Sequence, residues 1–254
     1  MTLLQSLSTK SPNFKKVAIE LLLIVTAFFT STLSGILGMG GGTVLFTLMA
    51  QFFPPAILIP VHGGIQIGSN SSRALLSFKS IRRDIFILFS LGAILGAFLG
   101  SRFLMTLPEN LSRIILGSFI LIETWMPDFK GSPKIPGKFF WVGFVCCFLS
   151  LFIGVTGPLQ APFFLREGLS KEGIVATKAA CQTFQHFLKV VTFVALGFMM
   201  GPYLGLIAGM LVAGFAGSLC GKLLLKRTSE NLFLWLFRSV ITVLAVKMMV
   251  NAIL

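Results

Sequence analysis

The chain has 254 residues, of which 55% are hydrophobic and 11% charged, and its mean hydropathy is +0.92. A soluble domain carries about 25% charged residues, so this composition excludes an ordinary soluble protein. Several apolar runs reach the roughly 20 residues that cross a bilayer, and they are continuous rather than alternating. The sequence therefore predicts an all-α polytopic membrane protein and argues against a β-barrel.

The formal net charge of +13 is concentrated in polar clusters between apolar segments, at 79–84, 130–138 and 222–227. Such clusters are typical of cytoplasmic loops and of contact with anionic headgroups, so we expect membrane lipid, and no nucleic acid, as a partner. If the N-terminal lysines and the first two clusters share the cytoplasmic face, the first half crosses four times and 222–227 lies outside. An odd number of crossings per half would instead make the two halves inverted.

The N-terminal tail 1–16 is polar, and an apolar segment follows without an evident small-residue cleavage site. We therefore expect a retained first membrane helix rather than a signal peptide. Residues 17–53 would form a helix of about 55 Å, which far exceeds a bilayer core of about 30 Å. The chain must therefore break or turn back in the glycine-rich stretch GILGMGGGT (35–43). The predicted helix-break residues here are Gly38, Gly40, Gly41 and Gly42.

The remaining segments repeat this layout on either side of a Pro/Gly/Lys-rich linker at 128–138. A polar-bearing segment at 56–78 and two apolar segments complete the first half. In the second half, an apolar segment ends in GVTGP (154–158), where Gly154, Gly157 and Pro158 are the predicted break residues. The sequence thus predicts a membrane repeat at 17–127 and another at 139–254, each with about four to five membrane segments.

A shift of 116 positions aligns the two halves without a gap. It places Gln66 on Gln182 and, at the breaks, glycine on glycine and serine on serine. Farther along, a shift of 121 aligns the glycine-rich runs at 92–100 and 214–221, whose small residues are expected to pack helices closely. We interpret this register as an internal duplication. Broken helices at matching places in two repeats typically mark a transporter binding site, although a packing kink is the alternative interpretation.

Both polar-bearing segments place polar side chains on one helical face, at i, i+4, i+8 and i+11. The first face consists of His62, Gln66, Asn70 and Arg73, and the second of Lys178, Gln182, His186 and Lys189. Neither face carries a carboxylate, so an anion from solution would complete the site. The alternatives are helix–helix hydrogen bonding by the amides and snorkelling of the terminal cations.

Hydroxyl groups near the two breaks would add hydrogen-bond donors to an anion held at helix N-termini. The candidates are Ser34, Thr43, Ser150 and Thr156. His62 or His186 could titrate near neutral pH, which leaves proton or ion coupling open. The four cysteines lie in apolar segments without a CxxC spacing, and the two histidines are too few for a metal cluster, so we expect no metal and no cofactor.

The glycine-rich break, the duplicated unit and the GAILGAFLG helix (92–100) resemble the sulfite exporter TauE/SafE family. The stretches HGGIQIGSNSSR (62–73) and TGPLQAPFFLREGLSKEGIVATKAACQTFQHFLK (156–189) look like a subgroup of it. The resemblance covers nearly the whole chain. It implies a multi-pass carrier of the bacterial inner membrane for sulfur-containing anions such as sulfite or organosulfonates, and no enzymatic activity.

We therefore expect an exporter that binds a small anion between the repeats near the bilayer midplane. An anion channel, or a carrier of another small organic or inorganic anion, stays open at this stage. A membrane enzyme is disfavoured because no nucleophile–base set or metal cluster is evident. A homo-oligomer also stays open.

Overall fold

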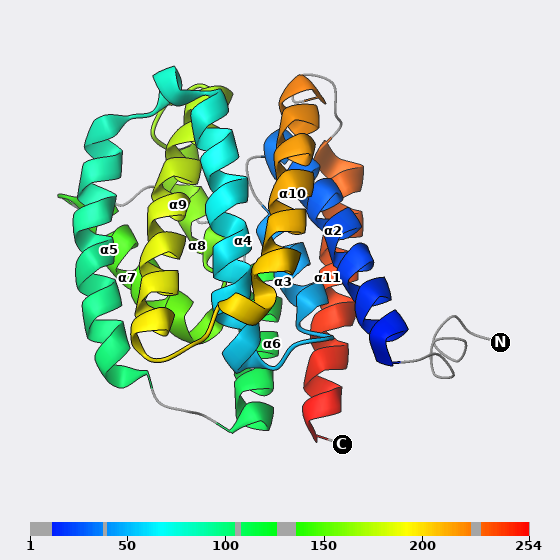
Figure 1. The fold of residues 1–254 in the computed structure, drawn as a ribbon. Helices are drawn as coiled ribbons and strands as arrows, with labels where there is room; N and C mark the ends of the chain where they lie inside the picture. Colours follow the sequence, from blue (N-terminus) through cyan, green and yellow to red (C-terminus); the bar gives the residue numbers. More distant parts are fainter. Residues whose placement is uncertain (1–11, 38–39, 105–107, 126–135, 225–229, 254) are drawn as a thin grey trace.

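The computed structural model describes residues 12–37, 40–104, 108–125, 136–224 and 230–253, and every regular element in these ranges is a helix (Figure 1). The elements of the first half are α2 (Pro12–Leu37), α3 (Gly41–Met49), α4 (Pro55–Leu76), the short 3₁₀ helix η1 (Phe78–Ser80), α5 (Arg83–Phe103) and α6 (Glu109–Trp125). Those of the second half are α7 (Lys138–Ile153), α8 (Gly157–Leu165), α9 (Lys171–Ala195), η2 (Gly201–Tyr203), α10 (Leu204–Leu224) and α11 (Glu230–Ile253).

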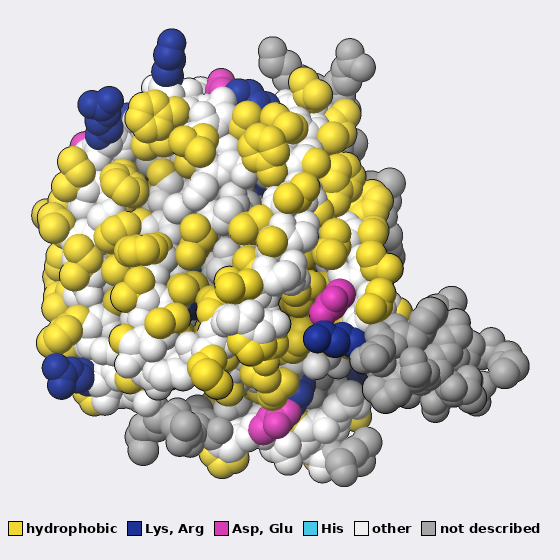
Figure 2. Space-filling model, viewed as in Figure 1, with side chains coloured by type: hydrophobic (Ala, Val, Ile, Leu, Met, Phe, Trp, Pro, Cys, Tyr) yellow, Lys and Arg dark blue, Asp and Glu magenta, His cyan; other side chains and the backbone are white. Residues whose placement is uncertain are grey.

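Three of the described helical segments are long and apolar enough to cross a membrane: Lys16–Ile36, Arg83–Phe103 and Gly201–Leu224. Two shorter apolar helices lie at Lys138–Ile153 and Ile241–Ile253. Large apolar side chains stay exposed on the outer surface, and Figure 2 shows them over much of the visible face. Such a surface suits lipid rather than water, so the chain is a membrane protein.

Glycines bring two helix pairs into backbone contact. Along α10, Gly217 lies against the backbone of Phe28, and Gly221 lies against that of Thr32, so α2 and α10 run parallel. In the same way Gly96 of α5 lies against the backbone of Phe144 in α7. Without a side chain in between, the helices approach closely enough for van der Waals contact along their length, which is how membrane helices associate.

The helices α4 and α9 lie side by side in the middle of the molecule, between the α2/α10 and α5/α7 pairs (Figure 1). Their 22 and 25 residues correspond to about 33 Å and about 38 Å, long enough to traverse a bilayer core. One buried apolar cluster supports this centre from the side of α3, and it includes Phe46, Leu58, Ile65, Ile153 and Met210.

One end of the molecule collects cations, and we call it the cationic end, defined by Lys79, Arg82, Arg83, Lys171 and Lys222. Two contacts tie its elements together. The Ser77 hydroxyl donates to a Glu172 carboxylate oxygen at 2.6 Å, and Lys222 Nζ donates to the Leu76 carbonyl at 2.5 Å.

These contacts bear on the two orientations that the charge clusters leave open. Lys222 lies beside the end of α4, at the same end of the bundle as the 79–84 cluster, and not across the membrane from it as four crossings in the first half would require. The start of α2, near Lys16, lies at the opposite end of the bundle (Figure 1). The N-terminal lysines therefore do not share a face with the 79–84 cluster. The reason is that α3 turns back after the break, so that α2 and α4 run in the same direction (Figure 1). Most of the linker 128–138 lies outside the described residues.

We predict that Gly217→Ala destabilises the fold, because a Cβ there would overlap the Phe28 carbonyl and push α10 away from α2. Overpacking of this kind costs about 1–3 kcal/mol. The measurement is the thermal unfolding midpoint in detergent. Gly205→Ala in the same helix is the matched control, since a Cβ there meets open space and alanine favours helix. Equal midpoints for the two variants would contradict the glycine-contact interpretation.

Candidate functional site

Two nine-residue helices begin at glycine-rich turns inside the bundle. Gly40, with φ +90°, precedes α3, and Gly154, with φ +81°, follows α7 shortly before α8 begins at Gly157. Only glycine adopts such positive φ values readily. A helix of nine residues is about 14 Å long, too short to cross a bilayer. Gly38, one of the predicted break residues, lies outside the described residues.

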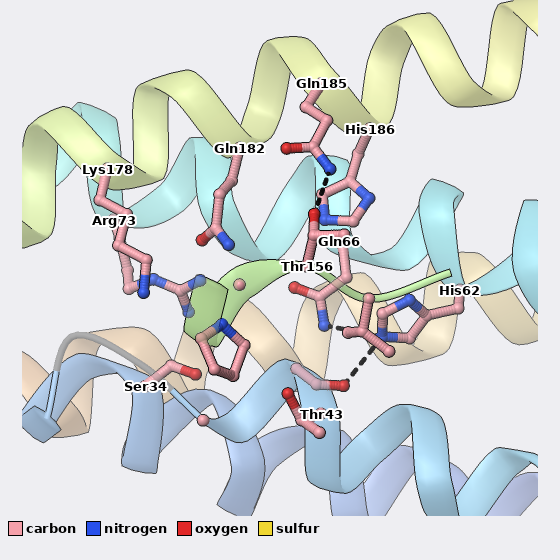
Figure 3. A pocket seen from close by; sticks show the side chains of 15 residues that line it. Ser34, Thr43, His62, Gln66, Arg73, Thr156, Lys178, Gln182, Gln185 and His186 are labelled. Atoms are coloured by element: carbon pink, nitrogen blue, oxygen red, sulfur yellow. Dashed lines mark hydrogen bonds between the residues drawn. The ribbon is translucent and has the colours of Figure 1, made fainter. Parts of the chain in front are cut away.

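A small cavity of about 30 Å³ lies where the first turns of α3 and α8 meet the facing sides of α4 and α9 (Figure 3). That is room for about two water molecules, so the cavity suits a small ligand. The lining includes these residues from the sequence prediction: Ser34, Gly40, Gly42, Thr43, His62, Gln66, Arg73, Thr156, Gly157, Pro158, Lys178, Gln182 and His186. Residues about 150 positions apart in sequence thus meet in one place.

The charge of the lining is one-sided. Arg73 and Lys178 are only 8% and 2% exposed, and the lining contains no Asp or Glu. Figure 3 shows these two cations at one end of the cavity, and His62 and His186 at the other. The N-terminal turns of α3 and α8 add the partial positive charge of unpaired backbone N–H groups. Together these groups favour a negatively charged ligand.

Two glutamine side chains lie in the middle of the cavity, between its two ends (Figure 3). A Cβ added to Gly42 would lie 3.0 Å from Gln66 Nε2, and one added to Gly157 would lie 2.9 Å from Gln182 Nε2. Each amide therefore lies directly against the first turn of a short helix, where a glycine leaves room for it. A small oxyanion in the cavity would be within reach of both amides and both helix ends.

Asn70 does not line the cavity but positions residues that do. Its Nδ2 donates to Gln66 Oε1 at 3.1 Å, and its Oδ1 accepts from Arg73 Nη2 at 2.5 Å. On the previous turn, His62 Nε2 lies 3.0 Å from the carbonyl oxygen of Gly42. The hydrogen bonds from Asn70 to Gln66 and from Arg73 to Asn70 thus fix the Gln66 and Arg73 side chains on the polar face of α4.

Two further predicted residues, Lys189 and Ser150, also lie outside the cavity. Lys189 is fully buried, and its Nζ donates to the Gly154 carbonyl at 2.5 Å and lies 3.3 Å from His186 Nδ1. A cation at that carbonyl satisfies the end of α7 and complements its dipole. The Ser150 hydroxyl donates back to the Cys147 carbonyl at 2.9 Å, inside α7. Both residues support the turn before α8 rather than the cavity itself.

Sequence reasoning missed Gln185, which lines the cavity, and Gln160, which supports it. Gln185 Nε2 donates to the Thr156 hydroxyl at 2.8 Å, and Gln160 Nε2 donates to Gln185 Oε1 at 2.5 Å. Both amides are at most 1% exposed. The signal was available, because Gln185 lies three residues after Gln182 and so shares its helical face.

No group of three or more His, Cys, Asp or Glu residues gathers as a metal site within the described ranges. None of the four cysteines forms a disulfide, and three of them are buried.

The fold and the cavity define a class: a helical membrane protein with a buried, cation-lined cavity at the ends of short internal helices. The family model described as "Sulfite exporter TauE/SafE" matches residues 23–248, nearly the whole chain. The chain belongs to this family, which is a family of membrane transporters and not a class of enzyme. Searches of curated proteins and of solved structures give no match.

We predict that Thr156→Val lowers the unfolding midpoint. The substitution keeps the shape but removes the oxygen that accepts from Gln185, and a buried amide left without its partner costs about 1–3 kcal/mol. The measurement is thermal unfolding in detergent. Thr183→Val in α9 is the control, because its hydroxyl only bonds back to the carbonyl of Ala179 within the same helix. A Thr156→Val protein as stable as the control variant would overturn the role of this hydrogen bond.

Proposed function

We propose that this chain is a multi-pass exporter of the bacterial inner membrane for a small sulfur-containing anion such as sulfite or an organosulfonate. The observation that carries the proposal is the convergence of two short-helix N-termini, two glutamine amides and two buried cations on one cavity without a carboxylate. An oxyanion satisfies all of these donors at once, and its charge balances cations that the protein leaves without acidic neighbours in the lining.

The proposed architecture is a duplication after the tail 1–16, with one membrane repeat at 17–127, the linker 128–138, and a second repeat at 139–254. Two sets of contacts support it, because α2 packs on α10 as α7 packs on α5, and α4 and α9 pack on each other. In Figure 1 the chain enters the first repeat at one end of the bundle and the second at the other. We therefore propose that the two repeats are inverted, with an odd number of crossings in each.

The proposed orientation follows from the cationic end. Its lysines and arginines belong on the cytoplasmic face by the positive-inside rule, which places the start of α2 on the outer face. The anion would then be taken up from the cytoplasm and released outside, the direction of an exporter. The proposal also includes proton or ion coupling through the histidines. It leaves the number of copies in the assembly open.

A channel, or a carrier of another anion, is the second candidate. The small volume of the cavity and the packing of Phe46 against His62 at one of its ends favour a carrier, since a channel needs a continuous wet path. Non-helical backbone inside the membrane is compatible with both a carrier and a channel. A carrier and a channel differ in whether the anion flux saturates with anion concentration, which can be measured.

We predict saturable transport of sulfite, thiosulfate or sulfoacetate by the purified protein in liposomes, because a bound anion must occupy one site per cycle. Flux is followed at rising anion concentration, with protein-free liposomes as the control. Absence of saturable flux for all three anions would sink the sulfur-anion proposal. Fast chloride flux that does not saturate would favour the channel.

We predict that Gln66→Ala and Gln182→Ala each weaken anion binding about ten- to hundredfold, because each removes one amide hydrogen bond to a charged group. Binding is measured by titrating the anion against protein in detergent, and the unfolding midpoint is recorded in parallel. Gln51→Ala is the control: Gln51 lies at the far end of α3, where its amide donates to the Leu244 carbonyl at 3.1 Å. Normal binding by both cavity variants would place the site elsewhere.

A further inference from the structure

A second, larger cavity of about 260 Å³ adjoins the first at the cationic end, and Arg73 lines both. Its mouth carries Glu172 and Lys222, whose side chains are about half exposed. Its inner wall carries Ser218, which is 1% exposed and whose hydroxyl has no hydrogen-bond partner. A buried hydroxyl without a partner is costly unless water or a ligand reaches it. We call this cavity the vestibule.

The other end of the small cavity is closed. The ring of His62 packs edge-on against Phe46 at 5.0 Å and against His186 at 6.0 Å. Phe46 is fully buried and Ile59 is 5% exposed. Beyond the histidines, Lys189 is fully buried and bonded to the Gly154 carbonyl. At one end the small cavity therefore adjoins the vestibule, with Arg73 between the two, and at the other end packed side chains close it.

The sequence shifts that align the two halves also pair residues of the vestibule with residues near the closed end of the small cavity. A shift of 116 places Arg73 on Lys189 and Val175, a wall of the vestibule, on Ile59, part of the seal. A shift of 121 places Ser218 on Ala97. These three vestibule positions thus have counterparts toward the closed end, which are buried: Lys189 at 0%, Ile59 at 5% and Ala97 at 6% exposed. Arg73 and Ser218 are themselves 8% and 1% exposed, so the two ends differ in the cavity beside these side chains and not in the exposure of the side chains.

We infer that Lys189, Ile59 and Ala97 line a second vestibule, closed in this structure, through which the anion leaves, and that Arg73 and Lys189 are the inner and outer gates. The inference rests on the proposed function and on the inverted repeat. If the halves exchange conformations, a cavity like the vestibule opens between α5 and α9, the helices that correspond to α10 and α4. Lys189 then leaves the Gly154 carbonyl for water and for the anion.

At both gates, the cation exchanges a neutral oxygen partner for the anion. No described carboxylate pairs with either cation, so each is held by neutral oxygens: Lys189 by a backbone carbonyl, and Arg73 by Ser69 Oγ and Asn70 Oδ1. An arriving anion offers either cation a stronger partner than a neutral oxygen. The anion therefore lowers the cost of releasing the Lys189 contact that seals the far side.

The test is thiol accessibility in membrane vesicles of both orientations, in a Cys220→Ser background that leaves the three buried cysteines. Ser218→Cys and Ala97→Cys are treated with a membrane-impermeant, negatively charged methanethiosulfonate. A thiol reacts where water lets it ionise. We expect Ser218→Cys to react from the face of the cationic end, and Ala97→Cys only from the opposite face. Added sulfite should shift the two rates in opposite directions.

The matched controls are the lipid-facing neighbours Leu219→Cys and Phe98→Cys, which should react at least about tenfold more slowly because lipid keeps the thiol protonated. Thr192→Cys, the counterpart of Leu76 in the vestibule, keeps the test decisive if Ala97→Cys does not fold. Closed-side cysteines as inert as Phe98→Cys from both faces, with and without sulfite, would overturn the second vestibule, as would an inert Ser218→Cys.

Sulfite flux measured in the same background separates this inference from the proposed function. Reactive cysteines on both faces without sulfite flux would leave the two vestibules standing and reject the anion. Saturable sulfite flux with inert closed-side cysteines would keep the anion and reject the second vestibule.

Discussion

Helix ends inside the bundle are the constraint on which the rest of this structure depends. Each helix end leaves up to four backbone groups without a partner, and lipid cannot supply one. The turns between α2 and α3 and between α7 and α8 place such ends at the centre of the molecule. A side chain satisfies one of these ends: Lys189 Nζ donates to the carbonyl of Gly154, just after α7. The polar face of α9 therefore has a structural role as well as its place beside the cavity.

The same constraint leaves the N-terminal turns of α3 and α8 for a ligand. Gln66 and Gln182 lie against these turns without covering them, because glycines at positions 42 and 157 keep the space open. The C-terminal end of α7 receives the protein's own cation, Lys189, and the N-terminal turns of α3 and α8 face the cavity. The result is a cavity of positive polarity without an acidic side chain in its lining, which is why we propose an anion as its ligand.

Much of this could be predicted from the sequence, because the patterns involved are local. Spacing along one helix puts Gln66 and Arg73 on one face, and the length of the apolar run from Val17 to Phe53 requires a turn near the glycines. Spacing along a helix does not reveal which side chains of a face reach the cavity and which support it from outside. Asn70 and Lys189 share the predicted faces, yet one positions its neighbours and the other ties down a helix end. Orientation was also out of reach, because it depends on α2 and α10 being parallel, a contact between residues nearly 200 positions apart.

The two polar faces differ in the cations that they carry at matching positions. At the vestibule end, the chain has Arg73 and Lys178, which are 8% and 2% exposed. At the sealed end, the matching positions hold Lys189 and His62, which are fully buried. Arginine and lysine are not equivalent partners for an anion, because the planar guanidinium can bind it bidentately whereas the lysine ammonium acts as a point charge. If the two proposed repeats exchange conformations, the replacement of arginine by lysine and of lysine by histidine therefore makes the two states differ in how they hold the anion.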